Sequence, residues 1–487
     1  MSHSHASQRF SRALLVLGLG LVVTATGCIS DGGSHSDVGD VGTGGDGPPA
    51  ADHCDEGAID GRLLTADPFD YQDVVDELGP GDCLQLEAGV YVNGLNLNDL
   101  HGEAGAPIVI EGPTDGDAVF EARSGSNTVS LRRVSHLTLR NVELDGMSTN
   151  AAGVVLERNP DRSEPSHHVT LEGLVIRNHD QSQGMTGITT REAAWGWVIR
   201  NNIIEATGTG LYLGRPDGTA PFVDGLVEHN LVRDTVGYNM QIKHQEPWAD
   251  EGIPDIPETG ARTVIRYNVF SKATGGAEGG SARPNVLLGH FPPEGPGSDH
   301  HYLVYGNLFY GNPTDESLLQ SDSSLAVFSN LFYNADGPAV RIRKHNARPR
   351  NVAFMGNTVV SKETALQLSN ADAAYSQTVG GNLIFAGRAY APDTDPESGT
   401  DETGALDAAD GVLENPFPED GGLPELHLRS PDVLPATTAW ALPDWVDADL
   451  VDFDGNPRAG DGPGAYEQSP CWTLDKAVRP QNTLACH

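Results

Sequence analysis

The clearest indication of the fold is in LVYGNLFYG (residues 303–311) and AVFSNLFYN (residues 326–334). In each segment, a stretch with apolar residues at alternate positions precedes an asparagine, and a second such stretch follows it. Alternation with a period of two residues is typical of β-strands. The spacings between successive copies are 37, 24, 28, 38, 39, 23, 27 and 25 residues, so a unit of about 25 residues repeats, three times with an inserted loop. The asparagines in register are Asn141, Asn178, Asn202, Asn230, Asn268, Asn307, Asn330, Asn357 and Asn382.

A repeat unit this short, built from strands and turns alone, is one coil of a parallel β-helix. Asparagine tolerates the left-handed conformation that a sharp corner between strands requires. Asparagines in stacked coils can also hydrogen-bond to one another as a ladder. A β-sandwich or a β-propeller is the alternative. We predict an all-β, single-stranded right-handed parallel β-helix solenoid.

An N-terminal capping helix is predicted, because the exposed first coil of a solenoid needs a cover. It is expected in FDYQDVVDEL (residues 69–78), with Asp67 as its N-cap and Pro68 as its first residue. The apolar residues at helical spacing are Tyr71, Val74, Val75 and Leu78.

The first 53 residues are predicted to be a targeting segment and a spacer. Two arginines precede an apolar stretch, and small residues then precede Cys28, as in a lipoprotein signal peptide spanning residues 1–27. This arrangement resembles a bacterial lipobox, which implies that Cys28 carries a lipid, and Ile29 after it implies the outer membrane. An ordinary signal peptide is the alternative. Residues 28–53, rich in Gly and Asp, are expected to be a flexible tether.

The other four cysteines are an even number in what would be an oxidising compartment. Their proximity suggests disulfides Cys54–Cys83 and Cys471–Cys486, although three connectivities are open. The β-helix is predicted over residues 54–395, followed by a C-terminal cap region over residues 396–487 with the motifs DFDGNPR and GAYE. Asp452 and Asp454 in this region could bind calcium, but a tight turn is favoured.

The charge balance restricts the partners. The chain has 30 Lys+Arg against 68 Asp+Glu, a net charge of -38. Nucleic acid is excluded, because phosphate binding needs a basic surface.

The segment PGDCLQLEAGVYVNGLNLNDLHGEAGAPIVIEG (residues 80–112) resembles the opening of exported pectate-lyase-like β-helix proteins. The nearest pattern is that of the alginate lyase and chondroitinase B family of polysaccharide lyases. This resemblance implies β-elimination on an acidic polysaccharide, with a lysine base, an arginine acid on the following coil, and Ca²⁺ held by Asn and Glu.

GYNMQIKHQ (residues 237–245) is similar in placement to the segment that carries the catalytic base in that lyase family. This resemblance assigns the role of base to Lys243. The next coil reads LLGHF (residues 287–291), so His290 replaces the arginine as the candidate acid, a role open to a group that titrates near neutral pH. Asn239 and Glu246 match the family's metal ligands only loosely, and Ca²⁺ is the one cofactor that the resemblance raises. A solvated sheet residue is the alternative for Lys243.

Outward positions of successive coils should form a column, because strand residues alternate between faces. That column is basic on a strongly acidic protein, which suggests an anionic ligand. A tyrosine in it could stack on a sugar ring. The predicted substrate-binding residues are Arg191, Tyr212, Gln241, His244, Arg341, Arg343 and His345.

These observations favour an exported, monomeric polysaccharide lyase, lipid-anchored at the outer membrane or cell surface. Two rivals stay open. A noncatalytic glycan-binding or adhesion scaffold would have the same fold, and a uronate C5 epimerase would share the proton abstraction without breaking the chain.

Overall fold

The computed structural model describes residues 54, 61–159, 164–248, 253–397, 399–419, 423–430, 433–434, 437–460 and 462–466. The predicted signal peptide, Cys28, the tether, and the pair Cys471 and Cys486 lie outside these residues. The predicted domain boundaries therefore stay predictions. In the described part of the chain, every helix is too short or too polar to cross a lipid bilayer.

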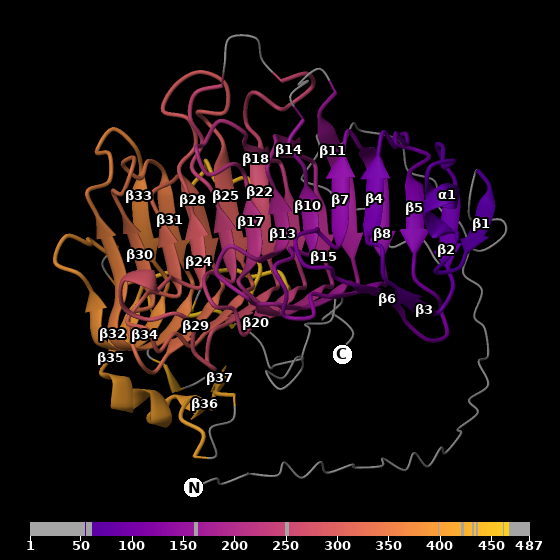
Figure 1. Ribbon diagram of the computed structural model, residues 1–487. Coiled ribbons are helices and arrows are strands. Elements are labelled where there is room, and N and C mark those ends of the chain that lie inside the picture. Colours follow the sequence, from indigo (N-terminus) through magenta and orange to yellow (C-terminus); the bar gives the residue numbers. More distant parts are fainter. Residues whose placement is uncertain are drawn as a thin grey trace, which may run out of the picture. The chain divides into compact units, whose positions relative to one another are not determined.

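Two large parallel sheets contain almost all of the strands, and they form three rows that we call ladders A, B and C (Figure 1). Ladder A is the 14-stranded sheet. Its strands are β1 (Leu63–Ala66), β2 (Cys83–Leu86), β5 (Ile108–Glu111), β8 (Ser135–Arg140), β11 (Ser166–Glu172), β14 (Ala194–Trp195), β15 (Val198–Arg200), β18 (Phe222–Val223), β19 (Leu226–Glu228), β22 (Arg262–Arg266), β25 (His301–Tyr305), β28 (Leu325–Phe328), β31 (Val352–Met355) and β33 (Gln377–Gly380).

Ladders B and C make up the 21-stranded sheet, in which the long strand β32 belongs to both. Ladder B contains β3 (Gly89–Tyr91), β6 (Ala118–Glu121), β9 (Glu143–Asp145), β12 (Val175–His179), β16 (Ile203–Thr207), β20 (Leu231–Arg233), β23 (Val269–Ser271), β26 (Leu308–Tyr310), β29 (Leu331–Asn334), β32 (Thr358–Ser369), β34 (Leu383–Tyr390) and β35 (Glu402–Gly404). Ladder C contains β4 (Leu95–Asn98), β7 (Val129–Arg132), β10 (Val154–Leu156), β13 (Thr186–Thr190), β17 (Thr209–Leu213), β21 (Met240–Ile242), β24 (Val286–Leu288), β27 (Leu319–Ser321), β30 (Val340–Arg343) and the end of β32.

The chain visits ladders A, B and C in turn, so that each coil adds a strand to each ladder beside the strand of the coil before it. All pairings within the ladders are parallel. This arrangement confirms the predicted parallel β-helix. The residues that alternate with the predicted outward column line the core of ladder C, since Ile188, Leu211, Met240, Val286 and Val340 are all 0% exposed. The alternation rule therefore assigned the two faces of this ladder correctly.

The predicted asparagine ladder exists at the corner between ladders A and B. Each buried asparagine donates its side-chain N–H to the Oδ1 of the next, for example Asn268 to Asn307 over 3.0 Å and Asn307 to Asn330 over 3.0 Å. The series runs through Asn202, Asn230, Asn268, Asn307, Asn330, Asn357 and Asn382, and ends on the carboxylate of Asp401.

The expected left-handed conformation is found at Asn141 and Asn178 but is wrong for the seven asparagines of the ladder. The left-handed residue is the one before each asparagine, such as Gly306 (φ 63) before Asn307 and Ser329 (φ 52) before Asn330. Asn141 (φ 56) is itself such a preceding residue, and Asn178 (φ 59) lies at another corner. The ladder asparagine is selected instead because its amide both donates and accepts in a dry corner.

The N-terminal helix is shorter than expected. Helix α1 spans Tyr71–Val75, and its N-cap residue is Asp70. Asp67 is not the N-cap, because its carboxylate accepts the N–H groups of Phe69 and Asp70 in the turn before the helix. The ring of Tyr71 packs edge-on against Tyr91 in the first coil, 5.0 Å between centroids. The predicted disulfide Cys54–Cys83 is present.

The remaining elements are two short 3₁₀ helices, Gly279–Ser281 and Leu406–Gly411, and the antiparallel pair β36 (Leu413–Asn415) and β37 (Glu425–Leu428). In the DFDGNPR motif, Asp452 and Asp454 are both fully buried. Asp452 Oδ1 accepts the backbone N–H groups of Asp454 and Asn456, 3.0 and 2.9 Å away. This is the tight turn that the sequence favoured over a calcium site.

Candidate functional site

The residues that follow the strands of ladder C bring a lysine and a carboxylate into one row on its outer face. Backbone hydrogen bonds from Lys243 N to Leu213 O and from Gly289 N to Ile242 O continue the strand register past β21. Continuing the same registers to the neighbouring coils completes the row. In coil order its members are Arg191, Gly214, Lys243, Gly289, Asp322 and Arg343.

Lys243 lies between two glycines, and these keep the space around it clear. A Cβ on Gly214 would lie 3.3 Å from Lys243 Cβ, and a Cβ on Gly289 would lie 2.7 Å from the Lys243 carbonyl carbon. Among the residues that the structure describes, none forms a hydrogen bond or ion pair with Lys243 Nζ. The ammonium group is therefore available to a ligand on the outer face.

Burial lowers the pKa of Lys243, because the charged ammonium loses hydration in this half-buried position. The negative charge of Asp322 opposes this shift. Asp322 is itself 5% exposed, and its Oδ2 accepts the backbone N–H groups of Asn346 and Ala347 at 2.8 and 3.1 Å. A lysine with a lowered pKa that faces a fixed carboxylate two coils away, across Gly289, has the electrostatics of a general base.

His244 and His290 lie together beside Lys243, with ring centroids 5.4 Å apart. Burial lowers the pKa of His244, and the charges of Lys243 and His290 lower it further. His290 is 8% exposed, and its Nδ1 lies 2.9 Å from the carbonyl oxygen of Phe291. Because a carbonyl can only accept, Nδ1 carries the proton, and Nε2 is left as the nitrogen that can exchange a proton.

A groove of about 520 Å³ lies on the coils before Lys243. Volumes of roughly 300–1,000 Å³ are typical of small-molecule sites. Tyr212 lines it, and burial raises the pKa of this hydroxyl to about 12, so that it stays protonated. Lys243 does not line the groove but lies one coil beyond it, next to Gly214. The lining residues are Arg158, Gln183, Gly184, Thr186, Thr189, Thr190, Arg191, Tyr212, Arg215, Pro216 and Asp217.

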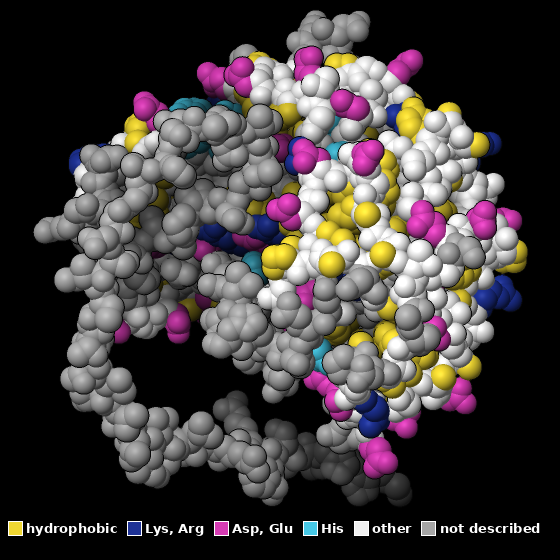
Figure 2. All heavy atoms as spheres, turned by 180° about the vertical axis from the view of Figure 1, so that it is seen from behind, with side chains coloured by type: hydrophobic (Ala, Val, Ile, Leu, Met, Phe, Trp, Pro, Cys, Tyr) yellow, Lys and Arg dark blue, Asp and Glu magenta, His cyan; other side chains and the backbone are white. Residues whose placement is uncertain are grey.

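The expected basic stripe is partly neutralised, which corrects the sequence-based charge pattern. Arg191 lies 3.6 Å from Glu157, and Arg341 lies 3.3 Å from Glu316. Acidic side chains are scattered over the face drawn in Figure 2, consistent with the net charge of -38 of the whole chain. The exposed Arg343, by contrast, has no ion-pair partner among the described residues. The local field is therefore mixed, and Lys243 and Arg343 are the cations of this row that have no ion-pair partner among the described residues.

The other candidates are spread more widely. Gln241 lies in register with Tyr212 but is only 6% exposed, and His345 is exposed in the turn after β30. Strand alternation would place Asn239 on the outer face with Gln241 and Lys243, but it is 0% exposed at the corner before β21 and donates to Thr235 and to the carbonyl of Ser271. Glu246 is exposed beyond the other end of β21, so these two loose calcium candidates do not share a site.

Sequence reasoning missed Asp322, which stands one place past the end of β27 and does not belong to the repeated phrase. Its position in the row of the lysine, two coils further along, follows only from the strand register. It also missed His136, His167 and His168, because ladder A carries no part of the predicted outward column. Aligning VSHLTL (residues 134–139) with SHHVTL (residues 166–171) could have found them.

Similarity to known proteins was assessed at the levels of sequence and structure. No protein-family model and no curated protein sequence matches this chain. Solved structures similar to it include an alginate lyase from Paenibacillus sp. str. FPU-7, with 16% identity, 70% of this chain and 99% of that chain covered, and a TM-score of 0.36. They also include the mannuronan C-5 epimerase AlgE6 A-module of Azotobacter vinelandii (17%, 68% and 93%, TM-score 0.40) and a lacto-N-biosidase from Eubacterium ramulus (14%, 60% and 68%, TM-score 0.34). The expected likeness to parallel β-helix polysaccharide lyases is thus found among solved structures, while the fold itself rests on the strand pairing given above.

Proposed function

We propose that this protein binds an acidic polysaccharide along the outer face of ladder C and cleaves it by β-elimination at Lys243. The observation that carries the proposal is the position of this lysine. It is half-buried, flanked by Gly214 and Gly289, without a partner for Nζ among the described residues, and one coil from a groove that holds Arg191 and Tyr212. Parallel coils are spaced about 4.8 Å apart, so a row of outward side chains matches a polymer better than a single small ligand.

In the proposed reaction, the neutral Lys243 amine removes the proton from C5 of a uronate unit. The electron pair of that C–H bond forms the C4–C5 double bond, and the bond from C4 to the glycosidic oxygen breaks. The leaving oxygen takes the Nε2 proton of His290, which acts as the imidazolium protonated on both nitrogens and is left as the neutral ring with its proton on Nδ1. Arg343, which like Lys243 has no ion-pair partner among the described residues, would bind a carboxylate of the substrate, and Tyr212 would stack on a sugar ring.

The product distinguishes this reaction from its rivals. The wild-type protein is incubated with alginate, pectate and chondroitin sulfate, and the absorbance of the unsaturated uronate is followed. Rising absorbance with at least one polymer supports elimination. An altered C5 configuration without absorbance would identify an epimerase instead, and saturable binding with unchanged polymer would identify a binding scaffold. Either result contradicts the lyase.

We also propose that the protein is exported, lipid-anchored through Cys28 at the outer membrane or cell surface, and monomeric, with the Gly/Asp-rich residues 28–53 as a spacer. This rests on the sequence pattern around Cys28. Metabolic labelling with a radioactive fatty acid in a bacterial host should label the wild-type chain and not Cys28→Ser. Equal labelling of both chains would contradict the lipid assignment.

A further inference from the structure

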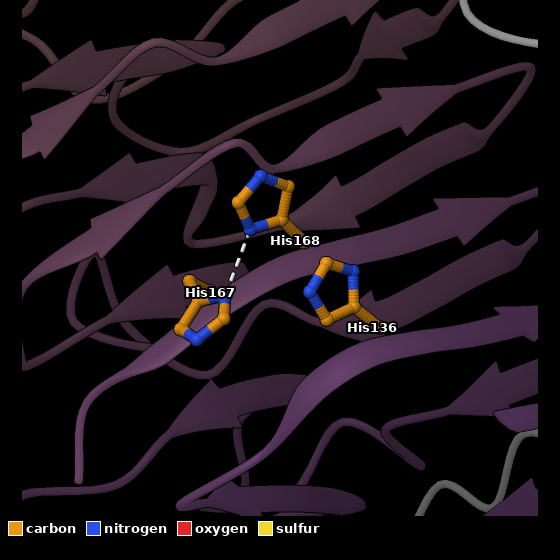
Figure 3. Close-up of side chains that lie close together, drawn as sticks. All are labelled: His136, His167 and His168. Atoms are coloured by element: carbon orange, nitrogen blue, oxygen red, sulfur yellow. Dashed lines mark hydrogen bonds between the residues drawn. The ribbon is translucent and has the colours of Figure 1, made fainter. Parts of the chain in front are cut away.

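Three histidines meet on the outer side of ladder A, away from the row that carries Lys243 (Figure 3). They come from adjacent coils, His136 from β8 and His167 and His168 from β11. The pairing of His167 with Ser135 and of Val169 with Leu137 puts His168 directly beside His136. None of them has a role in the function proposed for ladder C.

A break in strand alternation is what brings His167 and His168 together. Neighbouring residues of a regular strand point to opposite faces. His168 has a left-handed backbone (φ 51), as has His136 (φ 47), and this turns both side chains toward His167. The equivalent places in the next coils hold Gly196 (φ 63) and Asp224 (φ 52), residue types that adopt this conformation more easily than histidine. The coils of His136 and His168 thus carry a histidine at a left-handed position that the fold repeats, where glycine or aspartate is more favourable.

The imidazole nitrogens converge closely enough to share one ion. One nitrogen from each ring lies within 4.8 Å of the others, and Nδ1 of His167 lies 2.7 Å from Nδ1 of His168. Tetrahedral coordination with bonds of about 2.0–2.1 Å places nitrogens roughly 3.4 Å apart, which lies between these two values. At 2.7 Å the two Nδ1 atoms cannot both carry protons, so at least one presents a lone pair.

A neighbouring aromatic side chain orients one of the rings. Trp195 stacks on His167, with centroids 4.9 Å apart and an interplanar angle of 21°, and this fixes the ring. His168 is exposed, which leaves the cluster open to solvent on one side.

We propose that His136, His167 and His168 bind a divalent transition-metal ion such as Zn²⁺. Imidazole nitrogen suits Zn²⁺, Cu²⁺ and Ni²⁺, whereas Ca²⁺ requires oxygen ligands. Three histidines on one open surface leave a coordination position for water or a ligand. This proposal does not depend on the proposed lyase activity, because measuring metal binding alone tests it.

The test is a calorimetric titration of the untagged full-length chain with Zn²⁺ and, separately, with Ca²⁺. The variants are His168→Asn and His136→Asn, because asparagine accepts the left-handed backbone and the fold should be retained. The exposed His345→Asn on the turn after β30 is the matched control. Every other histidine is kept, so any background binding is common to all samples.

The wild type and His345→Asn should bind one Zn²⁺ per chain that is absent, or bound about 100-fold more weakly, in His168→Asn and His136→Asn. Mutating a residue that only supports a metal ligand lowers metal affinity about 10–100-fold. Loss of a ligand itself should therefore lower the affinity by at least the upper end of this range. Ca²⁺ should not compete. Wild-type stoichiometry and affinity in both variants, or no Zn²⁺ binding by the wild type, would overturn the proposal.

Discussion

The corner between ladders A and B and the outer face of ladder C show two uses of the same repeat. At the corner, coil after coil places the same buried asparagine, and each amide satisfies the next. On ladder C, the row in register holds Arg191, Gly214, Lys243, Gly289 and Asp322, a different chemistry in nearly every coil. Positions that repeat one residue maintain the fold, and positions where stacked coils differ are where a solenoid can hold a site.

The largest effect on stability is expected from a substitution in the asparagine ladder at the corner between ladders A and B. Asn307→Leu should lower the free energy of unfolding by about 3–4 kcal/mol, because the backbone N–H and a side-chain N–H of Asn268 lose the Asn307 acceptor in a dry corner and each unpaired group costs about 1–3 kcal/mol. Asn202→Leu is the control. Among the described residues, Asn202 Oδ1 accepts only the backbone N–H of Leu174, so the loss should be about half as large. Urea unfolding followed by circular dichroism measures both, and equal losses would contradict a cooperative ladder.

The second prediction concerns Gly289, which leaves room for the backbone that carries Lys243. Gly289→Ala would put a Cβ 2.3 Å from the backbone nitrogen of His244, so the segment that carries Lys243 must shift. We expect a loss of about 1–3 kcal/mol in stability together with a fall in polymer cleavage. Gly105→Ala is the matched control, because no atom lies within 4 Å of its added Cβ. Behaviour of Gly289→Ala like that of Gly105→Ala would show that the glycine is not required.

A subtler change tests the electrostatics of ladder C. The base must be neutral, so cleavage should rise with pH as Lys243 loses its proton. Because Asp322 raises the pKa that burial lowers, Asp322→Asn should move this ascending limb of kcat/KM to lower pH. Glu363→Gln removes an exposed carboxylate on β32 and should leave the limb in place. A limb that moves to higher pH in Asp322→Asn would contradict the assignment of Lys243 as base.

The smallest effect concerns the two arginines of β30. Arg343→Ala should raise KM about fivefold, the loss of an exposed charge contact of ~1 kcal/mol. Arg341→Ala should raise it less, because Arg341 is already paired with Glu316 at 3.3 Å. Steady-state kinetics on the cleaved polymer compare the two. A larger effect at Arg341 would reverse the distinction between paired and unpaired cations.

Much of the fold could be predicted because its signal repeats. The asparagine phrase and the alternation of apolar residues gave the parallel β-helix and the inward faces of residues such as Met240 and Val286. Helix α1 was misjudged in length because a local turn at Asp67 uses the carboxylate that was expected to cap the helix.

The site was harder to predict, because it depends on which coils are neighbours. The ion pairs of Arg191 with Glu157 and of Arg341 with Glu316 join residues on different coils, and no local pattern marks them. Asp322 and the three histidines of ladder A are likewise assembled by register alone. Side chains past the end of a strand leave the alternation rule, as Asn239 illustrates at its buried corner.

The contrast between the two regions is tested most directly by the cleavage rate of Lys243→Met on the polymer that the wild type cuts fastest. General-base catalysis contributes about 10²–10⁴-fold, so we predict a fall of at least about 100-fold with an unchanged unfolding midpoint. Lys362→Met, at an exposed position on β32, is the matched control and should cleave like the wild type. A Lys243→Met rate within about twofold of the wild-type rate would contradict the role of Lys243 as the base.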